Sequence, residues 1–337
     1  MKFLSKLIVL IFIVGLVLTI IAFSSGVNLS NLGSYFVDDE AYGDPIEYVS
    51  TTTIDHLNVD VDTRNVIVST TSGDSIIVTY RSHEDDIWTL SESAGTLNII
   101  QTTKPVVFHW FNFKFASYEI LTITIEIPES LILDYTIQSD TGDIIYNDGP
   151  ELISAMDIQS HTGRVELSEA SMDSLTIEMN TGTMNLSNLT ISGNLDGQTS
   201  TGNIYLDHVA ANLIDLDTNT GKVKGEYIAA LDLTASSNTG RVELNYSTLS
   251  GDLNLSTSTG AVKLKNTLAH SYDLSTHTGS VTFESTTSMD LKYDLDTATG
   301  NITINGSNQG STHSTTTGTV LLKIRVGTGS ITVSVQD

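Results

Sequence analysis

SNTGRVEL, at residues 237–244, decides the fold, because close variants of this octapeptide recur as TSTGAVKL at residues 257–264 and THTGSVTF at residues 276–283. The shared glycine returns at spacings of 18 to 21 residues, except for a final spacing of 11. The series is Gly142, Gly163, Gly182, Gly202, Gly221, Gly240, Gly260, Gly279, Gly300, Gly318 and Gly329. A period with so little drift indicates a repeat architecture.

The residues around each glycine alternate in polarity, which is the pattern of a half-buried strand rather than a helix. Leu253, Leu255, Thr257 and Thr259 are expected to face inward, and the polar residues between them outward. The alternation resumes after the glycine, so each repeat is predicted to contain two strands with a bend at Thr-Gly. Glycine suits a bend because it reaches backbone angles that a side chain forbids.

Two all-β folds fit this period. An antiparallel sandwich would separate equivalent strands, whereas a parallel solenoid stacks equivalent residues about 4.8 Å apart. Columns of Thr and Ser favour the solenoid, because their methyl groups pack and their hydroxyls can pair along a ladder. One inward ladder is predicted at Thr181, Thr201, Thr220, Thr239, Thr259, Thr278 and Thr299, and a second at Thr199, Thr218, Ser237, Thr257, Thr276 and Thr297. The predicted fold is an all-β, single-stranded parallel β-solenoid (β-helix) with 19–21 residues in nearly every coil, forming a rod about 50 Å long.

Composition excludes several classes of function. The 337 residues include 40 acidic and 15 basic side chains, for a net charge of −25, so nucleic-acid phosphates would be repelled. The chain has no cysteine, which excludes a disulfide framework, a lipidated cysteine and a thiolate metal site.

The N-terminus is predicted to direct the chain to a membrane. Lys2 and Lys6 precede an uncharged run at residues 7–23, which fits a transmembrane anchor; a cleaved signal peptide is the alternative. The lysines place residues 1–6 in the cytoplasm and the body outside the cell membrane, as a single-pass protein. Residues 24–50 are then a linker, residues 51–135 an N-terminal β cap with the first coils, and residues 136–337 the solenoid repeats. Within the cap, the turn at Ser72, Gly73 and Asp74 resembles a degenerate first repeat.

The run ITIEIPESLILDYTIQSDTGDIIY, at residues 123–146, resembles the bacterial "putative adhesin" family, a domain of unknown function. The resemblance covers roughly residues 48–337. It implies a β-solenoid associated with the cell envelope, and some members carry an N-terminal anchor and lie beside genes for envelope-stress signalling. It implies no catalytic residue.

No nucleophile elbow, paired-histidine metal motif, phosphate loop or dinucleotide fingerprint occurs. Some β-solenoids are polysaccharide lyases or hydrolases, but these usually build a groove from long loops, and coils of 19–21 residues leave little chain for one. We therefore expect no enzyme, no catalytic residue and no organic cofactor.

Outward aspartates form the candidate metal site. Two clusters are expected on adjacent coils, Asp196 with Asp215 and Asp217, and Asp273 with Asp294 and Asp296. Stacked carboxylates repel, and a calcium ion would relieve the repulsion. The alternative is a solvated acidic face that carries no ion.

Two further features are candidate interaction sites. A basic strip follows the bend at Lys222, Lys224, Arg241 and Lys263, with Glu243 alternating in sign. It predicts either contact with an anionic envelope polymer or a surface ladder of ion pairs. Trp110 and Phe111 lie in an aromatic run at residues 106–115, which predicts either the plug of the cap or a loop that touches lipid or a partner.

The last strand, residues 330–335, alternates and carries no charge or proline. If it is the terminal coil, Ile331 and Val333 belong to an unpaired edge that would pair with another copy or with a partner's strand. The competing arrangement is that residues 321–326 fold over the last coil as a cap.

These observations favour a membrane-anchored, extracytoplasmic β-solenoid that acts as a non-enzymatic, adhesin-like interaction protein. An envelope polymer or a membrane protein is the expected partner. The alternatives are a regulatory partner in envelope-stress signalling and a polysaccharide-active β-helix enzyme.

Overall fold

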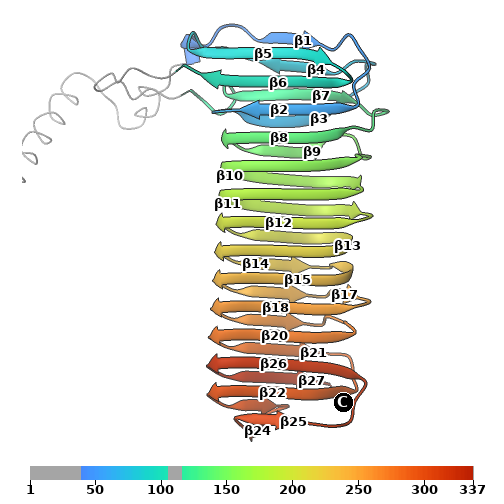
Figure 1. Ribbon diagram of the computed structural model, residues 1–337, viewed down its shortest axis with the longest axis vertical. Coiled ribbons are helices and arrows are strands. Elements are labelled where there is room, and N and C mark those ends of the chain that lie inside the picture. Colours follow the sequence, from blue (N-terminus) through green and yellow to red (C-terminus); the bar gives the residue numbers. More distant parts are fainter. Residues whose placement is uncertain (1–38, 105–115, 337) are drawn as a thin grey trace, which may run out of the picture.

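The computed structural model describes residues 39–104 and 116–336. They form a 3-10 helix, η2 (Asp39–Ala41), and a long stack of strands, β1 to β27, that makes a rod (Figure 1). Most pairings are parallel, which confirms the predicted all-β solenoid. The expected anchor at residues 7–23 and the aromatic run with Trp110 and Phe111 lie outside the described residues. No helix among the described residues is long and apolar enough to cross a membrane.

Each coil contributes one strand to each of two faces of the rod. The first face holds the strands that lead into the Thr-Gly bend, and the second face holds those that follow it. Equivalent residues of successive repeats are register partners: Leu253 lies between Leu233 and Tyr272, and Val262 lies between Val242 and Val281.

The first face contains β2 (His56–Val61), β5 (Asp86–Ser93), β6 (Thr96–Thr103), β8 (Asp134–Thr141), β12 (Asn194–Thr201), β15 (Ala229–Thr239), β18 (Asp252–Thr259), β20 (Ser271–Thr278), β22 (Leu291–Thr299), β25 (Thr312–Ser314) and β26 (Val320–Thr328). The second face contains β1 (Ile46–Val49), β3 (Asn65–Thr71), β4 (Ile77–Tyr80), β7 (Thr122–Pro128), β9 (Ile144–Asp148), β14 (Val223–Glu226), β16 (Val242–Asn245), β19 (Val262–Lys265), β21 (Val281–Ser285), β23 (Ile302–Ile304), β24 (Ser307–Gly310) and β27 (Ile331–Val335). The long strands β10 (Ala155–Met172), β11 (Ser174–Ile191) and β13 (Ile204–Thr220) bend through both faces, and β17 (Thr248–Leu249) bridges them.

The core is the layer between the two faces. Alternate residues of every coil fill it, as the polarity pattern predicts; Leu255 and Val262 are 0% exposed, whereas Asn254 is exposed. This burial removes apolar surface from water along the whole rod, which is the main stabilising contribution to such a fold.

The glycine at the bend is required sterically. Gly240 has φ of 155°, and a Cβ there would lie 1.7 Å from the carbonyl oxygen of Gly221 on the preceding coil. The same carbonyl oxygen of a neighbouring corner glycine faces Gly163, Gly182, Gly202, Gly221, Gly260, Gly279, Gly300 and Gly329, so the corner backbones stack closely. The expectation that Gly318 belongs to this series is wrong: it lies just before β26, and a Cβ there would meet the backbone of Leu291 and Lys292.

The predicted Thr and Ser ladders have different outcomes. The second ladder is buried, but its hydroxyls do not pair with one another. Thr218, for example, donates to the carbonyl oxygen of Gly202 at 3.1 Å, and Thr257 donates to that of Gly240 at 3.0 Å. The first ladder is wrong: the Thr before each glycine is exposed, because the chain turns there and two outward residues precede the glycine.

The coils do not stack in sequence order at the C-terminal end. The last coil, β26 and β27, lies between β20/β21 and β22/β23. The expected unpaired edge at Ile331 and Val333 is therefore wrong, since β27 pairs on both sides and both side chains are 0% exposed. The proposed cap at residues 321–326 is wrong for the same reason.

Antiparallel strands close this end. A hairpin turn at Asn305 and Gly306, with φ of 48° and 79°, sends β24 back along β23, and β25 then runs antiparallel to β22. These edge strands are short and polar, and the pairing of β23 with β24 is irregular, all of which discourage edge-to-edge pairing.

The N-terminal end has the reverse arrangement. The first coil, β2 and β3, lies between β6/β7 and β8/β9, while β5 and β4 run antiparallel to β6 and β7. Arg64 occupies the corner where later coils have glycine, since the Cβ of Gly142 would meet its carbonyl oxygen at 2.1 Å. The turn at Ser72, Gly73 and Asp74 instead joins β3 to β4, so its interpretation as a first repeat is wrong.

Candidate functional site

A groove follows the Thr-Gly corner along the first face. It consists of two adjoining cavities of about 280 and 600 Å³, which share Asp217. We call them together the corner groove. Its lining comes from the outward residues four and two positions before each glycine, so every coil contributes one rung of two side chains.

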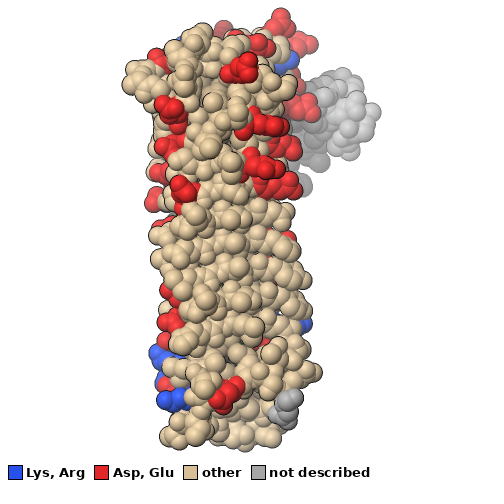
Figure 2. Space-filling view, turned by 90° about the vertical axis from the view of Figure 1, so that its right-hand side faces the viewer, with Lys and Arg blue, Asp and Glu red and all other residues tan. Residues whose placement is uncertain are grey.

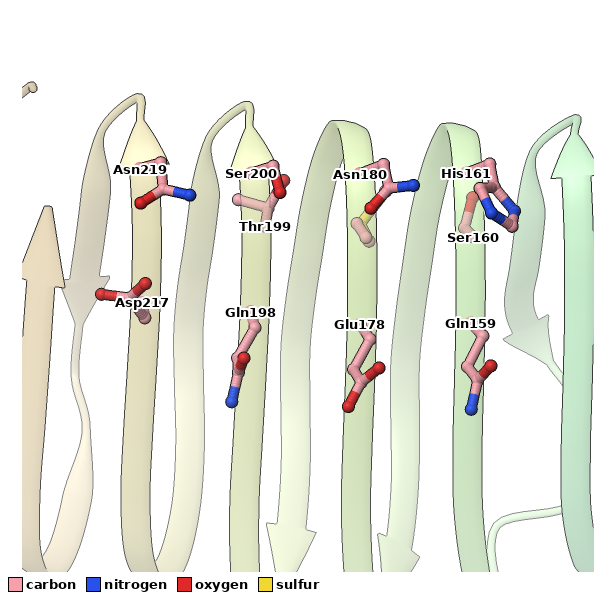
Figure 3. A pocket seen from close by; sticks show the side chains of 11 residues that line it. Gln159, Ser160, His161, Glu178, Asn180, Gln198, Thr199, Ser200, Asp217 and Asn219 are labelled. Atoms are coloured by element: carbon pink, nitrogen blue, oxygen red, sulfur yellow. The ribbon is translucent and has the colours of Figure 1, made fainter. Parts of the chain in front are cut away.

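Four rungs line the smaller cavity, as Figure 3 shows. One row consists of Gln159, Glu178, Gln198 and Asp217, and the other of His161, Asn180, Ser200 and Asn219. Parallel register holds the rungs in line, because Gln159 pairs with Glu178, Glu178 with Gln198 and Gln198 with Asp217. The larger cavity continues through Ser236, Ser256 and Ser275 to Arg325 and Asp296.

Most side chains of the smaller cavity are free to bind. Within residues 39–104 and 116–336, no hydrogen bond or ion pair is formed by the side chains of Gln159, Glu178, Asn180, Ser200 and Asn219. Elsewhere on the rod, stacked polar side chains satisfy one another, as Asn58 and Asn98 do at 2.9 Å. Three rung residues are engaged: His161 lies 3.0 Å from Asp140, Gln198 donates to Asp196 at 3.2 Å, and Asp217 accepts from Ser236.

The first predicted aspartate cluster is assembled. Asp196 and Asp215 are register partners, and Asp217 lies two residues along the same strand. Desolvation, followed by the charges of Asp196 and Asp217, raises the pKa of Asp215 above its ordinary value. The three carboxylates do not bring their oxygens within 4.8 Å of one another. Among the described residues, a ring nitrogen of His83 and carboxylate oxygens of Glu84 and Asp85 do lie within 4.8 Å of one another. Calcium binding at Asp196, Asp215 and Asp217 stays a prediction.

The second predicted cluster is wrong. Insertion of β26 places Lys323 between Asp273 and Asp294, and Arg325 beside Asp296. Lys323 bonds Asp273 at 2.6 Å, and Arg325 bonds Asp294 at 2.6 Å. The carboxylates therefore face cations of the protein itself rather than one another, which removes the repulsion that predicted a metal ion.

The basic strip lies on the second face as predicted, with Lys224, Glu243 and Lys263 on successive coils. Lys222 and Arg241 both reach Glu243, at 3.4 and 3.8 Å, and Lys224 reaches Glu226 at 3.0 Å. Most of the strip is therefore an ion-pair ladder. Lys263 forms no ion pair with any residue that the structure describes. Contact with an anionic polymer stays a prediction.

Sequence reasoning missed an aromatic ladder at the far corner of the second face. The rings of His208 and Tyr227 stack at 4.5 Å, and those of Tyr227 and Tyr246 at 5.5 Å. Lys265 Nζ lies 5.6 Å from the Tyr246 ring. All three ring-bearing residues have φ near 50°, which is rare for bulky side chains, and Glu169, Asn188 and Asn266 at the same turn position share it. The sequence signal that could have predicted the stacking is that all three rings lie six residues after the corner glycine of their repeat.

Sequence reasoning also missed a buried ion pair at the N-terminal end of the rod. Arg64 and Asp86 bond one another with side chains only 2% and 3% exposed. Gln101 donates to Asp86 at 3.0 Å, and the guanidinium lies 5.7 Å from the Trp88 ring. A lone arginine in place of a corner glycine was the available signal.

Comparisons with known proteins add the following. A family model described as Toastrack DUF4097 matches residues 54–230. No curated protein matches the chain. Three solved structures are similar to the chain. A "putative cell adhesion protein" from Clostridium sporogenes is 10% identical, with 87% of this chain and 100% of that chain covered and a TM-score of 0.23. A "putative adhesin" from Bacteroides fragilis is 14% identical, with 88% and 99% of the two chains covered and a TM-score of 0.37, and one from Parabacteroides distasonis is 11% identical, with 87% and 98% covered and a TM-score of 0.36.

Proposed function

The chain belongs to the Toastrack DUF4097 family, and we propose that it is a membrane-anchored, extracytoplasmic rod that binds a partner in the cell envelope without catalysing a reaction. The observation that carries the proposal is the corner groove, a long surface of repeated and mostly unengaged polar side chains.

The way the groove is built supports binding rather than catalysis. An active site brings different functional groups together around one reacting atom. Here each coil repeats the same two positions, and the connection from β18 to β19 is only two residues long. The groove therefore offers many similar contacts along a line, which suits an extended partner.

The distribution of charge supports display away from the membrane. Residues 38–178 contain 26 acidic and 5 basic side chains, a net −21, whereas residues 179–337 contain 14 and 8, a net −6. Figure 2 shows acidic side chains gathered over the N-terminal part of one face. If residues 7–23 anchor the chain, the most acidic half lies nearest the membrane. Any anionic headgroups on the outer surface would repel this half over roughly 10 Å, which favours a rod that projects outward.

The proposal is tested with the purified full-length chain and washed envelope material, separated into a polymer fraction and a membrane-protein fraction. We expect one fraction to retain the protein while releasing no soluble fragments. Fragments released in excess of the protein present, and increasing with time, would identify the polysaccharide-active enzyme instead.

An anchor exchange separates binding through the rod from regulation through the membrane segment. Residues 1–25 are replaced by an unrelated single-pass anchor. Retention unchanged by the exchange supports the proposed function, and retention lost in a folded variant supports a signalling partner that docks through its helix.

A further inference from the structure

We infer that the corner groove binds a linear, uncharged polysaccharide that lies along the axis of the rod, across the strands. This inference deepens the proposed function and rests on it. It names the class of ligand from the groups that the groove presents.

The groove can recognise a ligand only through side chains. Every first-face strand from β10 to β20 is paired on both sides, so its backbone donors and acceptors are occupied. A peptide that binds by adding a strand needs a free sheet edge. A ligand rich in its own donors and acceptors is the alternative.

The free side chains match sugar hydroxyls. The amides of Gln159, Asn180 and Asn219 each donate and accept hydrogen bonds, as a hydroxyl group does. The carboxylate of Glu178 can accept from two neighbouring hydroxyls. A polymer with several hydroxyls on every unit supplies partners for each rung.

The spacing suits a repeating ligand. Rungs follow one another at the strand spacing of about 4.8 Å, which is close to the advance of one sugar unit in an extended chain. The four rungs of the smaller cavity thus offer adjacent subsites to successive sugars.

The charges exclude a polyanion. No lysine or arginine lines the smaller cavity, and Glu178 and Asp217 both do. The larger cavity contains one arginine, Arg325, which bonds Asp294. Phosphate or uronate polymers would meet uncompensated negative charge.

The test is affinity electrophoresis of the full-length chain in mild detergent. Native gels contain glucomannan, glycol chitin or polygalacturonate, and mobility is measured against polymer concentration. The groove variant is Asn180→Ala with Asn219→Ala. The matched control is Asn185→Ala with Asn212→Ala, two asparagines outside the groove on the same stretch of coils.

We expect at least one neutral polymer to retard the protein. The groove variant should raise the dissociation constant by about tenfold or more, as loss of two polar contacts implies, and the control should leave it unchanged. Retardation by polygalacturonate alone, by no polymer, or equally in both variants overturns the inference. If envelope material retains the protein but no neutral polymer retards it, the proposed function survives and only the polysaccharide assignment fails.

Discussion

At the scale of the residue, the corner glycines are the least replaceable part of the repeat. Gly240→Ala would force a Cβ to 1.7 Å from a carbonyl oxygen at φ of 155°. Backbone strain of this kind costs on the order of 1–3 kcal/mol, and the clash adds to it. We expect a fall in the midpoint of urea unfolding that the exposed neighbouring variant Thr239→Ala does not show. Equal midpoints would mean that the coils do not approach as closely as described.

The repulsion between stacked carboxylates predicts a stabilising substitution, Asp215→Asn. Because folding raises the pKa of Asp215 above its ordinary value of 3.8, the folded state holds the proton more tightly than the unfolded state. The stability of the wild-type protein therefore falls as the pH rises from the ordinary pKa through the raised pKa of Asp215. At pH 7 the variant should gain roughly 0.2–1 kcal/mol. Near pH 3, where Asp215 is largely protonated because its pKa is raised, the gain should vanish.

Thermal melts at the two pH values check this expectation. Asp157→Asn is the control, because Asp157 occupies the same column but lies between Thr136 and Thr176. A gain at pH 3 as large as at pH 7, or the same gain in the control, would show that charge repulsion is not the cause.

Among the elements, one carboxylate on β5 holds the segment at residues 48–52, which we call the N-terminal arm. Glu92 accepts hydrogen bonds from the Tyr48 hydroxyl and from the backbone amides of Thr51 and Thr52, each at 2.8 Å. The hydrogen bond from the Thr52 side chain is the largest of the effects that lower its pKa from 4.5 to about 2. The stabilisation is therefore complete above about pH 4.5 and is lost as pH falls toward 2.

Glu92→Gln should loosen this arm, because a neutral amide accepts these bonds more weakly and has only one oxygen. Hydrogen exchange at pH 6 should show faster exchange of the Thr51 and Thr52 amides. Glu47→Gln, an exposed change on β1, should leave them protected. Unchanged protection in Glu92→Gln would indicate that strand pairing alone holds the arm.

The elements also show what the sequence could predict. The period, the two strands per coil and most buried positions follow from local alternation, and Leu253 and Leu255 lie in the core as the alternation predicts. The order of the coils depends on which strand pairs between two others, and local alternation does not determine this. Leu322, Ile324 and Val326 on β26 have the same alternation as the other first-face strands, so they do not indicate which strands β26 pairs with. The Asn305-Gly306 pair was a hairpin signal, and the spacing of 11 after Gly318 was a second sign that the last repeat is irregular.

Because local sequence does not determine the order of the coils, only part of the candidate site was predictable. Rungs between Gln159 and Asp217 come from coils that stack in sequence order, so their alignment was predictable. The cluster of Asp273, Asp294 and Asp296 was not, because a coil from the end of the chain separates its members. Side-chain freedom, which distinguishes the groove from the ion-pair ladder on the second face, depends on three-dimensional neighbours and has no local signal.

For the whole molecule, the order of the coils determines how both ends of the rod are built. It places Arg325 in the corner groove, pairs Lys323 with Asp273 and leaves the C-terminal end closed by β24 and β25. Both ends share this plan, with a terminal coil inside the stack and antiparallel strands outside it. A rod closed in this way has little free edge with which to polymerise.

Disulfide trapping tests the claim most directly, because the chain has no cysteine of its own. Thr282 and Thr332 are register partners, as are Thr332 and Thr303, so Thr282 and Thr303 lie two strands apart, about 9.6 Å. A disulfide needs Cα atoms within about 7 Å. Under mild oxidation, Thr282→Cys with Thr332→Cys should therefore form an intramolecular bond, and Thr282→Cys with Thr303→Cys should not. The opposite result, a bond between positions 282 and 303 and none between 282 and 332, would show that the coils stack in sequence order and would contradict the account.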